Sequence, residues 1–339
     1  MYIIVLRGES TLGEMTGYLQ KNSNKVIKKN TKSDSKSLLQ YIIKNKALYL
    51  MLLPSIILLT TLKYLPIFWN VIAFQDYQMG DGLKGILTSP WVGFKHFNYA
   101  FFESLDFWLI FKNTLVLGAL QIVWGFPAPL ILAILMNEIR VTWFKKVTQT
   151  IVYLPHFISW VVIAGMVQLL LAPDGGAINT IIKSFGGEPI AFLQLNEWWR
   201  TVFISAGIYK EVGFGTVIYL AALAGVNEEL YESAAIDGAN RFKMITKITL
   251  PSIIPTIIVL LILRVGSIIS INFEQVLLLY NSLVYDVSDV IQTYVYRTGI
   301  QAGRFSYATA INLFQSVIAL TLVFATNKIS KKFGEGGLW

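Results

Sequence analysis

The chain has 339 residues, of which 55% are hydrophobic and only 14% are charged, and its mean hydropathy is +0.58. Soluble domains average roughly 45–50% apolar and about 25% charged residues, so this excess indicates an integral membrane protein. The absence of cysteine excludes disulfides, thiolate metal sites and a catalytic thiol. No GxxxxGK[ST] run occurs, so the sequence shows no recognisable nucleotide-binding P-loop.

Six apolar segments reach the length of about 20 residues that a helix needs to cross a bilayer. The first contains Pro54 and Pro66 and the second contains Pro127 and Pro129, so both helices are expected to kink. In chain order the predicted spans are 47–72, 109–136, 150–171, 202–224, 253–271 and 308–327. The sequence therefore predicts an all-α membrane domain over 47–327 with six transmembrane helices.

The distribution of basic residues indicates how this domain is oriented. Eighteen Lys and Arg residues lie in the tail 1–46, the loops 137–149 and 225–252 and the tail 328–339, whereas the alternate loops contain six. Because Lys and Arg concentrate on the cytoplasmic side, both termini are predicted to be cytoplasmic. The net charge of +8 is then an orientation signal, and no nucleic-acid partner is expected.

The loop 227–255 carries the most distinctive pattern. Asn227 is suited to cap a helix, Gly238 permits the positive φ of a sharp turn, and Asn240 is suited to cap a second helix. The pattern predicts a helix, a glycine turn and another helix beside the membrane. Two interpretations stay open on the residues alone: a small-residue helix that inserts into a cleft on another protein, or a loop helix lying on lipid headgroups.

A motif within this loop resembles a known family. Glu232-Ser233-Ala234 is followed by Gly238 and, nine residues later, by Ile248-Thr249-Leu250-Pro251. This spacing is similar to the EAA loop of ATP-binding-cassette (ABC) importer permeases, with Ser233 in place of the first alanine. The resemblance implies that 227–251 is a coupling loop on which a cytoplasmic ATPase docks. The coupling residues that it implies are Glu232, Ser233, Ala234, Asp237, Gly238 and Ala239.

The resemblance extends to 153–179, 209–226, 283–300 and 305–332, which are similar to the sugar branch of these permeases, the LplB-like polysaccharide permeases. It implies a MetI-like type I importer fold with a core over about 109–327, as a multi-pass protein of the bacterial plasma membrane. The implied partners are a second permease, two ATPase subunits, an extracellular solute-binding lipoprotein, an oligosaccharide from complex polysaccharide, and lipid. The chain is then a transport subunit and not an enzyme, and ATP and Mg bind the ATPase, with no cofactor on this chain.

Charged residues inside the predicted spans are candidates for the substrate path. Lys210 and Glu211 in the fourth span and Arg264 in the fifth lie at similar depth. Charges in a membrane usually face a protein interior or a watery cavity. An ion pair between Glu211 and Arg264, or between subunits, is the alternative role for them.

Further candidates follow from the chemistry of sugar binding, which uses a few convergent polar groups. The candidates are the polar break after the fifth span, which comprises Asn272, Phe273, Glu274 and Gln275, and in addition Tyr209. Helix ends and packing are the alternative explanation of these residues. No catalytic or metal-binding residues are predicted.

Two other classes of protein compete with the permease hypothesis. An ion-coupled secondary sugar transporter would need buried carboxylates, yet Glu211 is the only acid inside a predicted span and it adjoins Lys210. A membrane-embedded hydrolase would need a motif such as HExxH or GxSxG, and neither occurs.

Overall fold

The apolar runs of the chain fold into helices throughout residues 40–332, which the computed structural model describes. No strand occurs over this range, and the only β-type pairing within it is an isolated bridge between Gln75 and Trp91. The all-α prediction is therefore confirmed for the described residues. Most of the predicted tail 1–46 and part of the tail 328–339 lie outside them.

The chain divides into two compact units between Trp69 and Asn70, so the first predicted span, 47–72, crosses the division. In the first unit, α3 (Lys46–Leu59), η1 (Thr60–Tyr64) and α4 (Leu65–Trp69) follow one another without a break. Pro54 lies inside α3. The π-helical turn η1 precedes Pro66, as expected where a proline removes a backbone donor.

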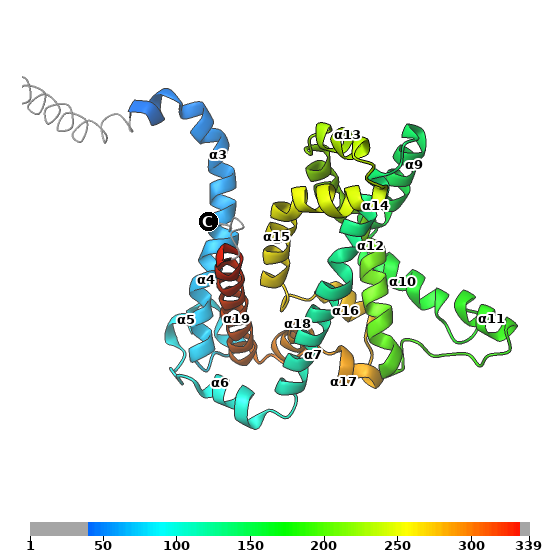
Figure 1. Cartoon of the computed structure of the whole chain (residues 1–339). Coiled ribbons are helices and arrows are strands. Elements are labelled where there is room, and N and C mark those ends of the chain that lie inside the picture. The colour runs from blue at the N-terminus through cyan, green and yellow to red at the C-terminus, as the bar shows by residue number, and fades with distance from the viewer. Residues whose placement is uncertain (1–39, 333–339) are drawn as a thin grey trace, which may run out of the picture. The chain divides into compact units, whose positions relative to one another are not determined.

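The second unit contains the remaining helices, which Figure 1 colours in chain order. Its first part comprises η2 (Asn70–Phe74), η3 (Met79–Asp81), α5 (Gly82–Thr88), α6 (Lys95–Asn98), η4 (Tyr99–Glu103), α7 (Phe107–Leu120), η5 (Gln121–Gly125), α8 (Pro127–Asn137), α9 (Thr142–Tyr153), η6 (Leu154–Phe157), α10 (Trp160–Leu170), α11 (Ala177–Ser184) and α12 (Asn196–Ala224). Its second part comprises α13 (Glu229–Ile236), α14 (Arg241–Met244), η7 (Ile245–Thr249), α15 (Leu250–Gly266), α16 (Phe273–Leu279), η8 (Ser282–Val284), α17 (Tyr285–Ser288), α18 (Ile291–Val295), η9 (Tyr296–Gln301) and α19 (Phe305–Lys332).

Four helical segments of the described residues are long and apolar enough to cross a membrane: Lys46–Phe74, Phe107–Asn137, Arg241–Gly266 and Phe305–Lys331. They overlap the predicted spans one, two, five and six. The fifth ends at Gly266, earlier than the predicted residue 271, because α15 gives way to turns there. The fourth predicted span lies within α12, a helix of 29 residues whose apolar character Lys210 and Glu211 interrupt.

The third predicted span, 150–171, is not one straight helix. Thr142–Phe157 and Trp160–Leu170 meet at an angle of 101° and count as a fifth span only if the bent pair is taken together. The break has a local cause, since Ile158 and Ser159 are extended. The Ser159 hydroxyl then caps α10 by accepting a hydrogen bond from Val162 N at 3.4 Å.

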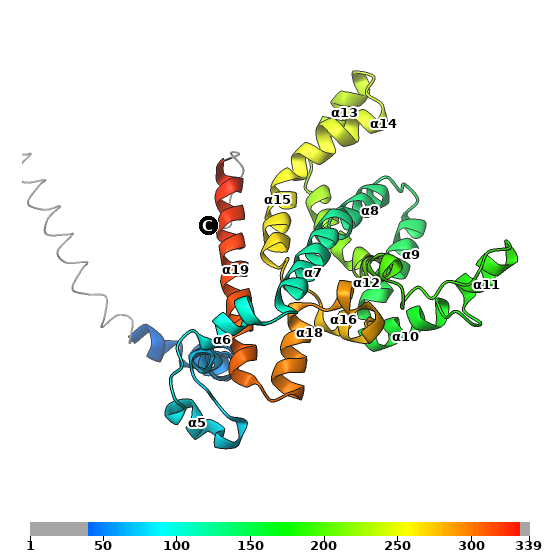
Figure 2. The same cartoon turned by 90° about the horizontal axis from the view of Figure 1, so that it is seen from below.

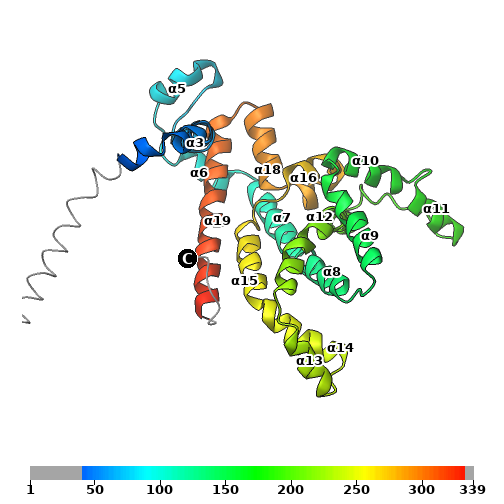
Figure 3. The ribbon, with the colours of Figure 1, turned by 90° about the horizontal axis from the view of Figure 1, so that it is seen from above.

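Helix α12 packs against α8, α9 and α15, and α15 also packs against α19. Two glycines of α12 allow these close approaches, as expected for membrane helices. A Cβ added at Gly215 would lie 2.9 Å from Cγ of Pro129, and one at Gly213 would overlap the carbonyl of Val152. Figures 2 and 3 show that α13 and α14 project from the end of α15 opposite to α16 and α18.

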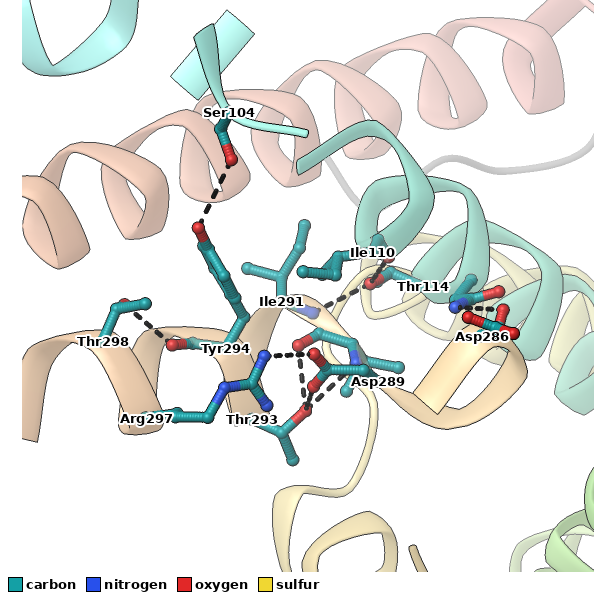
Figure 4. A network of polar contacts seen from close by, with 12 residues as sticks. Ser104, Ile110, Thr114, Asp286, Asp289, Ile291, Thr293, Tyr294, Arg297 and Thr298 are labelled. Atoms are coloured by element: carbon teal, nitrogen blue, oxygen red, sulfur yellow. Dashed lines mark hydrogen bonds and ion pairs between the residues drawn. The ribbon is translucent and has the colours of Figure 1, made fainter. Parts of the chain in front are cut away.

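A buried polar network fixes α18 against α7 (Figure 4). The Thr114 hydroxyl accepts a hydrogen bond from Ile291 N at 3.0 Å, and the Thr293 hydroxyl donates to Asp289 Oδ1 at 2.7 Å. The other carboxylate oxygen of Asp289 accepts from Arg297 Nη2 at 2.6 Å. Burial by itself lowers the pKa of Arg297, but the hydrogen bond and charge of Asp289 raise it above the ordinary value. The segment between α15 and α19 is therefore tied to the helical core.

Candidate functional site

The turn between α13 and α14 has the geometry that its sequence predicts. Gly238 has a φ of +74°, a conformation that side chains other than glycine rarely adopt. Ala239 N donates to Ala234 O at 2.9 Å and Gly238 N donates to Ala235 O at 3.1 Å, which closes α13 with a Schellman motif. The predicted helix, glycine turn and helix are confirmed.

The two sides of this turn support one another. The Asn240 side chain caps α14 by accepting a hydrogen bond from Lys243 N at 2.9 Å. The hydroxyls of Tyr231 and Thr249 lie 2.9 Å apart and join α13 to η7. The Asn227 side chain accepts from Glu229 N at 3.0 Å at the start of α13. The turn is thus rigid without help from another chain.

The outer surface of the turn is a small exposed patch of mixed chemistry. Glu232, Ser233 and Asp237 are exposed, and Ala234 and Ala239 are half-buried. Two large apolar side chains project beside them, Ile236 with 86% of its surface exposed and Phe242 with 73%. Exposed apolar side chains flanked by carboxylates are suited to a protein partner. We call Glu232, Ser233, Ile236, Asp237 and Phe242 the turn surface.

A cavity of about 570 Å³ opens between η5, α8, α12, α15 and the segment that enters α16. Its volume lies within the range of about 300–1,000 Å³ that is common for ligand sites. Its polar side chains are Gln121, Glu211, Tyr219, Arg264, Ser267, Ser270, Asn272 and Gln275, and the ring of Trp160 also lines it. Glu211, Arg264, Asn272 and Gln275 were candidates from the sequence, and the fold brings these four together.

Glu211 and Arg264 have different partners from the one considered in the sequence analysis. Glu211 Oε2 lies 3.0 Å from Nδ1 of His156, whose ring stacks on Phe214 with centroids 4.1 Å apart. Arg264 Nη2 donates to Oε1 of Gln121 at 3.2 Å. The Glu211–Arg264 ion pair is thus not formed, because each group is bound by a nearer side chain.

Lys210 does not line this cavity. Its side chain is only 7% exposed, and its ammonium donates to the carbonyl oxygens of His156 at 2.7 Å and Ile158 at 2.5 Å. The ammonium also lies 5.7 Å from the ring centroid of Trp160. Lys210 therefore satisfies carbonyls at the break between η6 and α10, which a continuous helix would have satisfied itself.

The other sequence candidates lie in several places. The Asn272 side chain caps α16 by accepting from Gln275 N at 3.0 Å, and Gln275 Nε2 donates to Phe203 O at 2.6 Å. Phe273 packs on Tyr296 with ring centroids 5.3 Å apart, and Glu274 is exposed. Neither lines the cavity. Tyr209 lines a separate apolar groove of about 460 Å³ between α10, α11 and α12.

The comparisons with known proteins agree with this arrangement. Residues 125–333 match the family model described as "Binding-protein-dependent transport system inner membrane component". This chain belongs to that family. The match begins after Gln121 but covers the rest of the cavity, the α13–α14 turn and α19, so the permease fold and the location in a membrane follow from it.

Two curated relatives cover nearly the whole chain. The polygalacturonan/rhamnogalacturonan transport system permease protein YteP of Bacillus subtilis (strain 168) is 47% identical over 91% of this chain and 95% of its own length. Protein LplB of the same organism is 46% identical over 87% of this chain and 92% of its own. These matches confirm the resemblance to LplB-like permeases, and the name of the first relative describes a transport component.

A solved structure supports the fold independently. A chain in the crystal structure of a bacterial alginate ABC transporter, in complex with an alginate pentasaccharide-bound periplasmic protein, superposes with a TM-score of 0.80. It is 42% identical, and the match covers 89% of this chain and 99% of that one. The MetI-like permease architecture is thereby confirmed for this chain.

Two side-chain partners were missed by sequence reasoning: Gln121, which lines the cavity and binds Arg264, and His156, which lies against Glu211. Gln121 is 143 residues from Arg264, and His156 is 55 residues from Glu211. Neither partner follows from a local pattern, although His156 stands directly after Pro155 near the start of the third predicted span.

Proposed function

We propose that this chain is one permease subunit of an ATP-driven importer of oligosaccharides derived from complex polysaccharide. The observation that carries the proposal is the continuity between the turn surface and the cavity. The chain passes from the α13–α14 turn through η7 directly into α15, and α15 carries Arg264 in the cavity wall. One helix can therefore transmit a movement from the turn to the site that binds the cargo. The sugar branch of the family is supported by the polysaccharide and oligosaccharide names of the relatives.

The permease crosses the membrane six times in this account, with both termini in the cytoplasm. The bent pair of α9 and α10 supplies the third crossing and α12 the fourth. Lys210 and Glu211 are tolerated inside α12 because each has a partner within the protein. The excess of Lys and Arg in alternate loops then makes the α13–α14 turn cytoplasmic.

Two copies of a cytoplasmic ATPase, which bind ATP and Mg, act on this turn. The exposed Ile236 and Phe242 enter an apolar cleft on the ATPase, and Glu232 and Asp237 bind cationic side chains there. ATP-driven closure of the ATPases displaces the turn, and α15 carries the displacement to the cavity as a rigid lever.

A second, homologous permease completes the translocation path. An extracellular solute-binding lipoprotein delivers the oligosaccharide when the pair faces outward. The cavity binds it through Gln121, Arg264 and the other polar groups, with the ring of Trp160 as an apolar face. ATP hydrolysis returns the pair to the inward-facing state.

An ion-coupled transporter is the less favoured function. Such a mechanism needs a carboxylate that gains and loses its ion during transport, and Glu211 is bound to His156 at 3.0 Å. The family match also concerns binding-protein-dependent transport systems.

Reconstitution separates these functions. The permease pair, the ATPases and the lipoprotein are assembled in proteoliposomes with an oligosaccharide outside. Uptake that requires ATP and the lipoprotein, and that stops with an ATPase mutated in its catalytic base, is the expected result. Uptake that follows a proton or sodium gradient without ATP would overturn the proposal.

A further inference from the structure

The charged side chains near the cavity differ in what they can offer to a substrate. The Lys210 ammonium is buried and donates to two backbone carbonyls. The carboxylate of Glu211 lies on His156 at 3.0 Å. These two charges are engaged by the chain itself, so neither is a ready ligand for a charged group on the substrate.

Arg264 is different. It lies on α15 in the cavity wall and is exposed, and among residues 40–332 the only hydrogen bond from its guanidinium goes to Gln121, at 3.2 Å. A guanidinium carries five N–H donors and no acceptor, so the oxygen of Gln121 must face it and several donors are left for the cavity. Gln121 fixes the orientation of the guanidinium without neutralising its charge.

We propose that Arg264, oriented by Gln121, binds a carboxylate of the transported sugar, so that the cargo is an acidic, uronate-containing oligosaccharide. The planar fork of a guanidinium matches the two oxygens of a carboxylate, and such charge-assisted hydrogen bonds are about twice as strong as neutral ones. This inference rests on the proposed transport function.

The rest of the cavity is compatible with a uronate. The hydroxyls of Ser267 and Ser270 and the amide of Asn272 also line the cavity and suit sugar hydroxyls. The named cargo of two relatives has the same chemistry, since one transports polygalacturonan and another imports alginate, described as an acidic polysaccharide.

The test measures ATP-dependent uptake of oligogalacturonate and of a neutral galactose oligosaccharide of equal length by the reconstituted transporter. Arg264→Gln is expected to lower the uptake efficiency for oligogalacturonate at least tenfold, equivalent to about 1.4 kcal/mol. Its effect on any neutral oligosaccharide that the native transporter carries should stay below about twofold. Arg264→Lys, which retains the charge without the fork, should give an intermediate loss.

A second variant retains Arg264 but gives its guanidinium a carboxylate partner within the chain. Gln121→Glu puts a carboxylate beside the guanidinium and should lower oligogalacturonate uptake as Arg264→Gln does. Arg140→Gln, which removes an exposed charge outside the cavity, is the matched control and should transport normally.

The remaining outcomes would overturn either this inference or the proposed function. The inference is wrong if Arg264→Gln carries oligogalacturonate as the native chain does, or if the native transporter carries only neutral oligosaccharides. It is also wrong if Arg264→Gln loses both substrates equally or fails to assemble, since Arg264 would then pair with the partner permease. If the native transporter carries no oligosaccharide in the presence of ATP, the proposed function itself fails.

Discussion

The break in the third span makes a specific prediction about Lys210. In Lys210→Met, the carbonyls of His156 and Ile158 lose the donors that they now have at 2.7 and 2.5 Å. Each unsatisfied buried carbonyl costs about 1–3 kcal/mol. Part of this cost is offset, because the variant no longer buries the ammonium of Lys210, whose desolvation is itself unfavourable. The expected net loss of stability is about 2–3 kcal/mol.

The assay is the thermal midpoint of the purified permease complex in lipid nanodiscs, compared under identical conditions. Lys210→Met should lower the midpoint by several degrees, and Lys210→Arg should restore part of it, because a guanidinium can also donate to two carbonyls. Lys112→Met is the matched control, since Lys112 is exposed on α7. An unchanged midpoint for Lys210→Met would refute the view that this ammonium stabilises the break.

Three further predictions address other parts of the chain. Asp289→Ala should destabilise the complex by about 2–3 kcal/mol, as measured by thermal unfolding. This loss is smaller than that for breaking a fully buried ion pair, because Arg297 is 31% exposed. Gly238→Val should leave membrane insertion intact but abolish sugar-stimulated ATPase activity and co-purification of the ATPase, since φ is +74° there; normal transport would contradict this. Single cysteines at Ser184 and Ser233, both exposed, should differ in labelling of intact cells by an impermeant thiol reagent: only the one at Ser184 should react, and the reverse pattern would overturn the topology.

Features that depend on local chemistry were predictable from the sequence. The turn at Gly238 and the cap at Asn240 follow from residues within a few positions of one another. The long apolar segments gave spans whose ends agree with the helices to within a few residues at 109–136 and 308–327. The motif around Glu232 was long enough to identify the family.

Features that depend on tertiary contacts were not predictable. The ammonium of Lys210, which donates to a carbonyl at the break between η6 and α10, is 52 residues from Ile158 in the chain. An ion pair between Glu211 and Arg264 was one of the alternatives, but the observed partners are His156 and Gln121, because matched depth and opposite sign carry no information about which faces of two helices meet. Each of these features depends on a tertiary contact, and the periodicity of the sequence does not encode such contacts.

The central claim is that the α13–α14 turn docks on the cytoplasmic ATPase and transmits its movement to the cavity. Disulfide cross-linking tests it directly, with Ser233→Cys in this otherwise cysteine-free chain and single cysteines along the cleft of the ATPase. The account predicts a cross-link that forms in the assembled transporter, blocks ATP-driven uptake and is reversed by reductant. A cysteine at Ser233 that never cross-links to the ATPase, while transport continues at the native rate, would contradict it.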